Sequence, residues 1–209
     1  MSNEEILSFY NQHMLTVNNE ALLAENYGGY LRGHNGCLVE NIAIMFLTSI
    51  CEELELKDVT IDSKKERLYD KDGNYYDFSI DIQLKYKDKI FIVIEAKTYC
   101  EISMFKRVLF DREIAKRHQG VEKAFLLQLE DAMGNEGVGS KIKYSPTVKF
   151  LLNEGYDINI LTLLEGQRRS SRPISKPEFF KELKPEVLDD IRNVLKKAIQ
   201  EEYNRISSI

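Results

Sequence analysis

Three charged residues, Asp81, Glu95 and Lys97, have the types and the spacing that a hydrolytic metal site needs. Glu95 and Lys97 lie at the end of the apolar run Ile90–Lys97, which has the pattern of a strand buried on both faces. Side chains alternate along a strand, so these two point to the same face. A hairpin centred on Asp88 would place Asp81, on the preceding strand, directly opposite Glu95. The sequence therefore predicts two neighbouring carboxylates beside an ammonium group.

Two carboxylates at directly opposed strand positions need a cation between them. Their Cβ atoms are about 5 Å apart, and unshielded charges at that distance repel. Mg²⁺ prefers oxygen ligands and is usually held by one or two carboxylates, waters and substrate phosphate. Held by Asp81 and Glu95, it would stabilise negative charge on a bound substrate and lower the pKa of a bound water. We expect Lys97 to lie beside the attacking water and to position it through its charge. This electrostatic role is preferred to that of a general base.

The elements that must position these residues begin with a helix. Apolar residues recur at three- and four-residue spacing over Leu38–Glu53, after the glycine-bearing stretch 32–36, which interrupts the chain. Two segments rich in β-branched and aromatic residues follow, Val59–Tyr69 and Tyr75–Tyr86, with a turn between them. Together with Ile90–Lys97, they predict a three-stranded antiparallel meander.

The second half of the chain supplies further layers. Helical spacing runs over Phe105–Met133, with an interruption at Gly120, and a glycine-bearing mobile loop is expected over Gly134–Pro146. Another apolar strand is expected over Ile158–Leu164. A closing helix is predicted from an apolar stripe of four residues, Leu188, Ile191, Leu195 and Ile199.

The motif and its elements resemble the PD-(D/E)xK nuclease superfamily, which includes many type II restriction endonucleases. Asp81 matches the first acid of the family motif, Glu95 the second and Lys97 the lysine, while Ile80 stands where the family name has proline. The αβββαβ core of the family also matches the predicted order of elements from about Leu38 to Leu164. The resemblance implies a restriction-endonuclease-like α/β fold, with a mixed central sheet flanked by helices, and in-line attack by water.

The resemblance also implies a cofactor, Mg²⁺, with Mn²⁺ as a substitute. The metal-binding residues are expected to be Asp81, Glu95, Ala96 and Glu40, and the catalytic residues Asp81, Glu95, Lys97 and Glu40. Glu40 lies near the start of the first predicted helix, where many family members carry another acid. That position also suits an acid that stabilises a helix N-terminus, so both interpretations of Glu40 stay open. His34 has the character of a loop histidine, with metal ligation as the second interpretation.

Local basic clusters are the candidates for contacts to nucleic acid, because neutralisation of phosphates dominates such binding. One cluster follows the motif and comprises Lys106, Arg107 and Arg112. The other lies in a polar loop after the last predicted strand and comprises Arg168, Arg169 and Arg172. Solvated protein surface is the alternative for both clusters.

The overall composition excludes several classes of protein. The 209 residues carry 29 Lys and Arg against 34 Asp and Glu, a net charge of -5, so the chain is not basic throughout. No apolar run approaches the roughly 20 residues of a membrane span, so no membrane contact is expected. The three cysteines lack a CxxC pair, which favours a reducing cytoplasm. In Ser140-Lys141 the order is the reverse of a P-loop, so no nucleotide cofactor is expected.

We therefore predict one nuclease domain over residues 1–209, with an N-terminal arm or short helices at 1–36, a catalytic core at 37–165, and a basic loop and closing helix at 166–209. The predicted activity is Mg²⁺-dependent cleavage of double-stranded DNA by a homodimeric, site-specific type II restriction endonuclease. One alternative is another nuclease of the superfamily, acting in repair, junction resolution, phage defence or on RNA. The other is a catalytically inactive nucleic-acid-binding module, which the presence of all three motif residues argues against.

Overall fold

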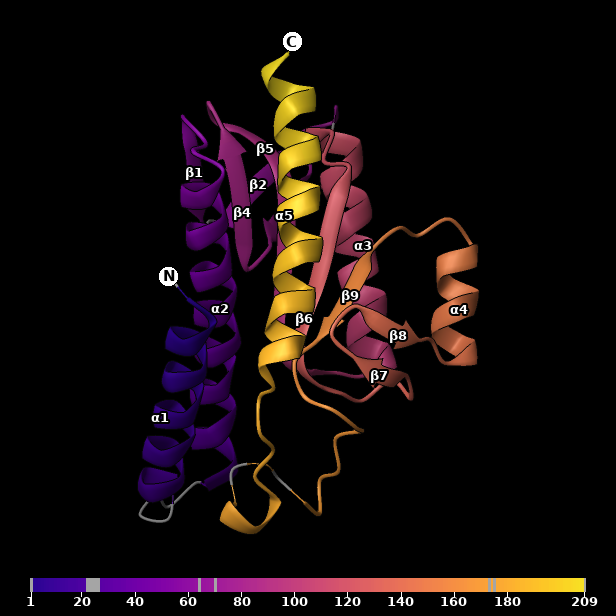
Figure 1. The fold of residues 1–209 in the computed structure, drawn as a ribbon. Coiled ribbons are helices and arrows are strands. Elements are labelled where there is room, and N and C mark those ends of the chain that lie inside the picture. The colour runs from indigo at the N-terminus through magenta and orange to yellow at the C-terminus, as the bar shows by residue number, and fades with distance from the viewer. Residues whose placement is uncertain are drawn as a thin grey trace.

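The chain folds around a mixed five-stranded sheet with helices on both faces (Figure 1). The computed structural model describes residues 2–21, 27–63, 65–69, 71–172, 174 and 176–208. In spatial order the strands are β1 (Val59–Asp62), β4 (Ile82–Tyr86), β5 (Lys89–Cys100), β6 (Lys123–Asp131) and β9 (Asn159–Thr162). The first three are antiparallel neighbours and the last three are parallel. This confirms the predicted α/β class with a mixed central sheet flanked by helices.

Three helices cover one face of the sheet and a fourth covers the other. The first layer consists of α1 (Asn3–Ala21), α2 (Tyr27–Glu53) and α5 (Pro185–Ser207), and the second of α3 (Ile102–Gln119). The stripe predicted for the closing helix is confirmed, since Leu188, Ile191, Leu195 and Ile199 are all buried.

Helix α2 is longer than the sequence predicts. The stretch 32–36 was expected to interrupt the chain, but the helix begins at Tyr27 and passes through it without a break. A glycine inside a helix costs about 1 kcal/mol relative to alanine. Burial of Leu38, Ile42 and Phe46 on this one continuous helix is worth several times that amount, at about 1.5–3 kcal/mol for each side chain. Packing therefore outweighs the local preference of the glycines.

The predicted meander is wrong, because each of its first two strands is divided. The segment 59–69 forms β1 and β2 (Lys65–Tyr69), and the segment 75–86 forms β3 (Tyr75–Ser79) and β4. In the part of the chain that the structure describes, β2 and β3 pair with each other alone, as a separate antiparallel hairpin, while β1 pairs with β4 in the main sheet. The division after Ser79 leaves Asp81 immediately before β4, where the chain leaves the hairpin and enters the main sheet.

A β-bulge sets the register between β4 and β5. The connecting turn is centred between Lys87 and Asp88, both with positive φ (46° and 67°), and not on Asp88 as predicted. Near this turn Tyr86 pairs with Lys89, a register that would leave Asp81 out of line with Glu95. The register shifts between Leu84 and Lys85, where Phe91 is an extra residue on β5. Beyond the bulge Ile82 pairs with Ile94, which places Asp81 opposite Glu95.

Strand β6 was wrongly predicted as part of a helix. Helix α3 ends at Gln119, and Gly120 caps it in the left-handed conformation (φ 68°). The four-residue spacing of Val121, Phe125 and Leu129 suggested that the helix continues, yet Lys123–Asp131 is buried almost throughout, as in a strand covered on both faces. Because β6 is the strand that follows α3, it closes the αβββαβ order, and the predicted strand 158–164 becomes the additional edge strand β9.

The segment Gly134–Pro146 is a second hairpin and not the predicted mobile loop. It contains β7 (Glu136–Val138) and β8 (Lys141–Lys143), which are antiparallel. A short helix, α4 (Pro146–Asn153), follows, and the Ser145 hydroxyl caps it by accepting a hydrogen bond from the Val148 N–H. A 3₁₀ turn, η1, spans Pro177–Phe179 before α5. Among the described residues, none of the helices combines the length and the apolar character that crossing a bilayer requires.

Candidate active site

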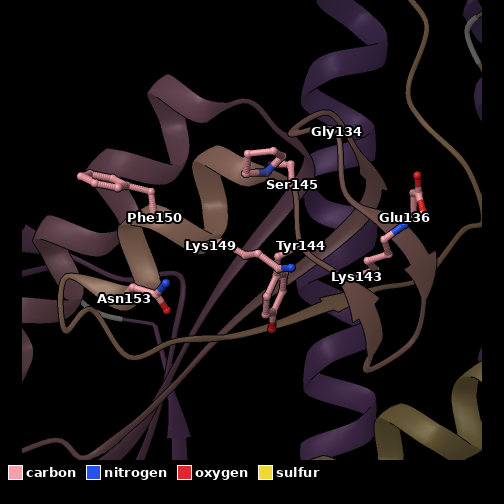
Figure 2. Close-up of a pocket in the computed structure, with 9 residues that line it drawn as sticks. Gly134, Glu136, Lys143, Tyr144, Ser145, Lys149, Phe150 and Asn153 are labelled. Atoms are coloured by element: carbon pink, nitrogen blue, oxygen red, sulfur yellow. Dashed lines mark hydrogen bonds and ion pairs between the residues drawn. The ribbon is translucent and has the colours of Figure 1, made fainter.

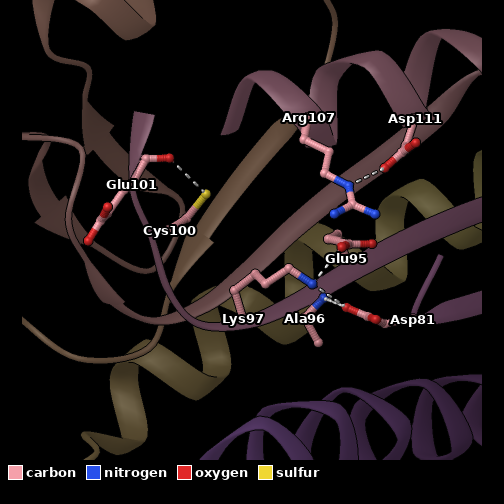
Figure 3. A network of polar contacts seen from close by, with 8 residues as sticks. All are labelled: Asp81, Glu95, Ala96, Lys97, Cys100, Glu101, Arg107 and Asp111. Atoms are coloured by element: carbon pink, nitrogen blue, oxygen red, sulfur yellow. Dashed lines mark hydrogen bonds and ion pairs between the residues drawn. The ribbon is translucent and has the colours of Figure 1, made fainter. Parts of the chain in front are cut away.

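The three motif residues meet where β4 and β5 separate (Figure 3). The described pairing between these strands ends at Ile82 and Ile94. One residue further along, Asp81 Oδ2 accepts hydrogen bonds from the main-chain N of Ala96 at 2.9 Å and from Lys97 Nζ at 3.0 Å. The carboxylate of Asp81 therefore takes a main-chain donor that would otherwise face the neighbouring strand.

Glu95 is the most perturbed acid of this site. Its Oε1 lies 2.5 Å from Lys97 Nζ, and its side chain is only 14% exposed. Burial, followed by the charge of Asp81, raises the pKa of Glu95 to about 7, although the ammonium of Lys97 acts in the opposite direction. A cavity of about 10 Å³, too small for more than one water, adjoins Glu95. The ionised carboxylate of Glu95 is thus poorly solvated, and the positive charge of Lys97 does not fully compensate for this.

Lys97 remains a cation in this environment. Burial lowers the pKa of Lys97, but the carboxylates of Glu95 and Asp81 outweigh that effect, and the pKa lies above its ordinary value. Without a metal, an ammonium held by two acids donates hydrogen bonds and does not accept a proton. This geometry favours the electrostatic role predicted for Lys97 over that of a general base.

Glu40 reaches the edge of this cluster from helix α2. Burial raises its pKa, the charge of Asp81 raises it further, and Lys97 lowers it, so the three side chains interact across the space between helix and sheet. Within the described part of the chain, however, no three acidic, histidine or cysteine side chains lie close enough to hold a metal ion together. Glu40 therefore lies near Asp81 and Lys97 without forming a preassembled triad of acids with Asp81 and Glu95. The side chain of His34 lies outside the described residues.

Asp111 is a residue of the site that the sequence reasoning missed. It lies on α3, is 7% exposed, and its charge contributes to the raised pKa of Glu95. It accepts a hydrogen bond from the Tyr76 hydroxyl, and its other oxygen lies 3.9 Å from Nε of the exposed Arg107. A signal was present in the sequence, because Asp111 shares a helix face with Val108 and Ala115, three and four residues away, and an acid within an apolar stripe needs a reason.

The predicted basic contacts fall into two groups with different surroundings. Lys106 and Arg107 are exposed on α3, but Arg112 is 3% exposed. Its guanidinium donates to the main-chain oxygens of Asp157, Val121 and Glu122 at 3.1, 2.9 and 2.8 Å. The fold uses these donors to join α3 to two loops, which contradicts the prediction that Arg112 contacts nucleic acid.

The second basic group lies in the segment that follows β9. Arg169 and Arg172 are exposed and, together with Lys181, line a hollow of about 320 Å³. Arg168 is half-buried, and its guanidinium lies 3.6 Å from the centre of the Tyr99 ring. Since Tyr99 follows Lys97 by two residues on β5, this loop approaches the strand that carries the candidate active site.

A larger hollow, of about 570 Å³, lies between the β7–β8 hairpin and α4 (Figure 2). Tyr144, Lys149 and Phe150 line it, and its acid, Glu136, pairs with Lys143 at 2.8 Å. None of the residues predicted for catalysis, metal binding or nucleic-acid contact lines this hollow. We therefore place the candidate active site at the separation of β4 and β5.

The sheet, with two acids and a lysine where an antiparallel pair separates, is compatible with a restriction-endonuclease-like core. The chain is similar to the type II restriction enzyme DdeI of Desulfomicrobium norvegicum (strain DSM 1741 / NCIMB 8310), with 35% identity over 137 residues. That match covers 60% of this chain and 54% of the relative, so the chain spans about half the length of the enzyme it resembles. No protein-family model matches the chain, and no solved structure matches it.

Proposed function

We propose that the chain is a single-domain, metal-dependent endonuclease that hydrolyses phosphodiester bonds of DNA at specific sites. The observation that carries this proposal is the meeting of Asp81, Glu95 and Lys97 in a half-buried position where β4 and β5 separate. The similarity to a type II restriction enzyme supports the substrate class. We also propose that the chain acts in the cytoplasm.

The side chains at this position fit a hard divalent cation. Carboxylate oxygens are the ligands that Mg²⁺ prefers, and one or two of them, completed by waters and substrate phosphate, are sufficient. The raised pKa of Glu95 supports the same choice, because burial, followed by the charge of Asp81, disfavours the ionised carboxylate more than Lys97 favours it. A bound cation would relieve that cost. We propose that Asp81, Glu95 and the main-chain oxygen of Ala96 hold Mg²⁺, or Mn²⁺ as a substitute, and that Glu40 contributes from α2.

The chemistry divides between the ion and the chain's own residues. The ion, when bound, lowers the pKa of a water and stabilises the negative charge of the transition state. Lys97, kept charged by two acids, orients the attacking water and adds positive charge beside the scissile phosphate. The Ala96 N–H holds the Asp81 carboxylate in one orientation, which limits the reorganisation needed during the reaction.

We also propose that the enzyme acts on double-stranded DNA as a homodimer. A two-fold symmetric protein matches a palindromic site and can cut both strands. Contacts to the DNA backbone are proposed for four exposed basic residues, Lys106, Arg107, Arg169 and Arg172, and for the half-buried Arg168. Size-exclusion chromatography with light scattering, with and without duplex DNA, measures the oligomeric state, and a monomer bound to DNA would contradict this part of the proposal.

The test is cleavage of unmethylated phage DNA by the purified protein, with Mg²⁺ or with EDTA. Wild type is compared with Asp81→Asn and Lys97→Ala, each of which removes one charged group of the cluster. Lys89→Ala is the matched control, because Lys89 is an exposed lysine at the other end of the same strand. Discrete bands that need Mg²⁺, persist in the control and disappear in the other two variants are expected.

Two other outcomes would change the conclusion. A metal-dependent smear would keep the catalytic site but replace site-specific cleavage with a nonspecific or structure-selective nuclease. Absence of cleavage on duplex DNA, single-stranded DNA and RNA, together with no Mg²⁺ or Mn²⁺ binding by calorimetry, would refute the proposed activity. The cluster would then be a charged surface feature of an inactive module.

A further inference from the structure

We propose that Arg168, held against the ring of Tyr99, binds a backbone phosphate of the substrate strand beside the scissile position. This inference rests on the proposed function and deepens it: it places the contact of Arg168 beside the scissile phosphate and names Tyr99 as the residue that orients it. The guanidinium of Arg168 lies 3.6 Å from the centre of the Tyr99 ring. A planar cation stacked on an aromatic face keeps its N–H donors at the rim of the ring, where they remain available to a ligand.

The place of this pair in the fold fits the catalytic strand. Tyr99 follows Lys97 by two residues on β5, a rise of about 7 Å along the strand. One strand of B-DNA presents a phosphate for about every 3.4 Å of helix axis, so a neighbouring phosphate lies within this distance. If the DNA strand runs along β5 with its scissile phosphate at Lys97, as this inference requires, an adjacent phosphate reaches Arg168.

The loop that carries Arg168 is fixed at its base by the buried carboxylate of Asp131. Asp131 Oδ1 accepts hydrogen bonds from Gln128 Nε2 at 3.0 Å and from Asn135 Nδ2 at 2.8 Å. Its Oδ2 accepts from the main-chain N of Met133 and of Asn135, each at 3.0 Å, and from Gln167 Nε2 at 2.7 Å. One acid thus binds the end of β6, the start of the β7–β8 hairpin and the residue preceding Arg168.

The main chain completes this attachment. The main-chain N–H of Arg168 donates a hydrogen bond to the main-chain oxygen of Asp131 at 2.7 Å, and Gln167 forms a parallel β-bridge with Asp131. Figure 1 shows the segment after β9 leaving the sheet where β6 and β9 end. Because the backbone of Arg168 is held before any ligand arrives, less conformational entropy is lost on binding than at a free loop position.

The three arginines of this loop differ from the other arginines whose side chains are described, because their charges are not balanced by acids. Each of the others has a partner, either an acid, as for Arg107, Arg117, Arg192 and Arg205, or main-chain oxygens, as for Arg112. In the described residues, the guanidinium groups of Arg168, Arg169 and Arg172 form no ion pair with an acid. Phosphate oxygens are anionic acceptors that match the donors of a guanidinium.

The experiment measures binding of a fluorescent duplex in Ca²⁺, which replaces Mg²⁺ to prevent cleavage, as a function of salt. Arg168→Ala should weaken binding about tenfold and lower the slope of log K against log salt by about one, as expected when one phosphate contact is lost. Arg168→Lys should keep the slope, because the charge remains. Arg117→Ala is the matched control, since Arg117 is an exposed arginine in the last turn of α3.

Tyr99 is tested by two further variants in the cleavage assay. Tyr99→Phe keeps the ring and should retain the wild-type KM, whereas Tyr99→Leu should raise KM about tenfold with a smaller change in kcat, because Arg168 is no longer oriented. Arg168→Gln, which keeps most of the side-chain stem, replaces Arg168→Ala if circular dichroism shows that the alanine variant does not fold.

The outcomes separate this inference from the function on which it rests. If wild type cuts DNA while Arg168→Ala and Arg168→Gln retain the slope of Arg117→Ala, the phosphate contact is wrong and the nuclease assignment stands. If Tyr99→Leu has the wild-type KM, the positioning role of Tyr99 is wrong. If wild type neither binds nor cuts nucleic acid, the proposed function fails and the inference fails with it.

Discussion

Replacement of Glu95 by glutamine is expected to make the metal-free protein more stable at pH 8. The folded protein raises the pKa of Glu95 to about 7 from an ordinary value of 4.5. Because a tenfold change in acid dissociation corresponds to about 1.4 kcal/mol, ionisation of Glu95 costs the folded state about 3 kcal/mol. That cost already contains the favourable contact with Lys97, since the ion pair is one of the influences on the pKa.

The sign of the pH dependence follows from the same two pKa values. For an acid whose pKa is higher in the folded state, the destabilisation is absent below pH 4.5, grows as the pH rises, and is complete above about pH 7. Glu95→Gln removes the ionisation, so its advantage should approach about 3 kcal/mol at pH 8 and fall to about 1 kcal/mol or less at pH 5.

Urea denaturation of wild type and Glu95→Gln at pH 8 and pH 5, in EDTA, measures this difference directly. Glu154→Gln is the matched control, because Glu154 is exposed in the loop after α4 and should show no comparable gain at either pH. A Glu95→Gln variant that is less stable than wild type at pH 8 would refute the reasoning. It would mean that the contact with Lys97 outweighs burial and the repulsion by Asp81.

The remaining predictions concern the metal, the fold and the second hairpin. Proton competition at Glu95 should make Ca²⁺ binding about tenfold weaker at pH 6 than at pH 8, and equal affinities by calorimetry would contradict this. Arg112→Leu should lose about 3 kcal/mol or more of unfolding free energy, because three main-chain oxygens lose a charged donor, and an unchanged urea midpoint would contradict it. Gly137→Ala should lower Tm, because the φ of Gly137 is +108° and an added Cβ would lie 2.1 Å from the main-chain oxygen of Lys141. Gly73→Ala is the control for backbone strain alone, because Gly73 has φ +82° but open space around the added Cβ.

The sequence predicted the class of the fold and the neighbouring positions of the motif residues better than the individual strands. Alternation placed Glu95 and Lys97 together, and the pattern of the apolar run 90–97 was strong enough to identify a central strand. The position of Asp81 opposite Glu95 was reached by a compensating error. The turn is centred half a residue earlier than predicted, and the extra residue Phe91 restores the register before Asp81 is reached.

The failures share one cause, since each depends on contacts between distant segments. Periodicity could not show that 121–131 is a strand, because four-residue spacing and continuous burial coincide there, and its pairing with β5 decides the outcome. The glycines of α2 suggested a break that packing overrides. Arg112 lies in a basic cluster of the sequence and so suggests a contact to nucleic acid. Its three main-chain acceptors, however, lie 9, 10 and 45 residues away along the chain, so the sequence alone gives no sign of them.

The energetics of the site argue against a solvated salt-bridge surface as the explanation of the motif. Such a surface would expose its charges, balance them in pairs and leave the pKa values near their ordinary range. Here Glu95 is 14% exposed, and Asp81 and Asp111 both add to the cost of its ionisation, which a single lysine does not offset. Retaining that cost is understandable where a ligand relieves it. A divalent cation would do so, since added positive charge stabilises the ionised carboxylates, and the imbalance therefore favours a metal site over a purely structural cluster.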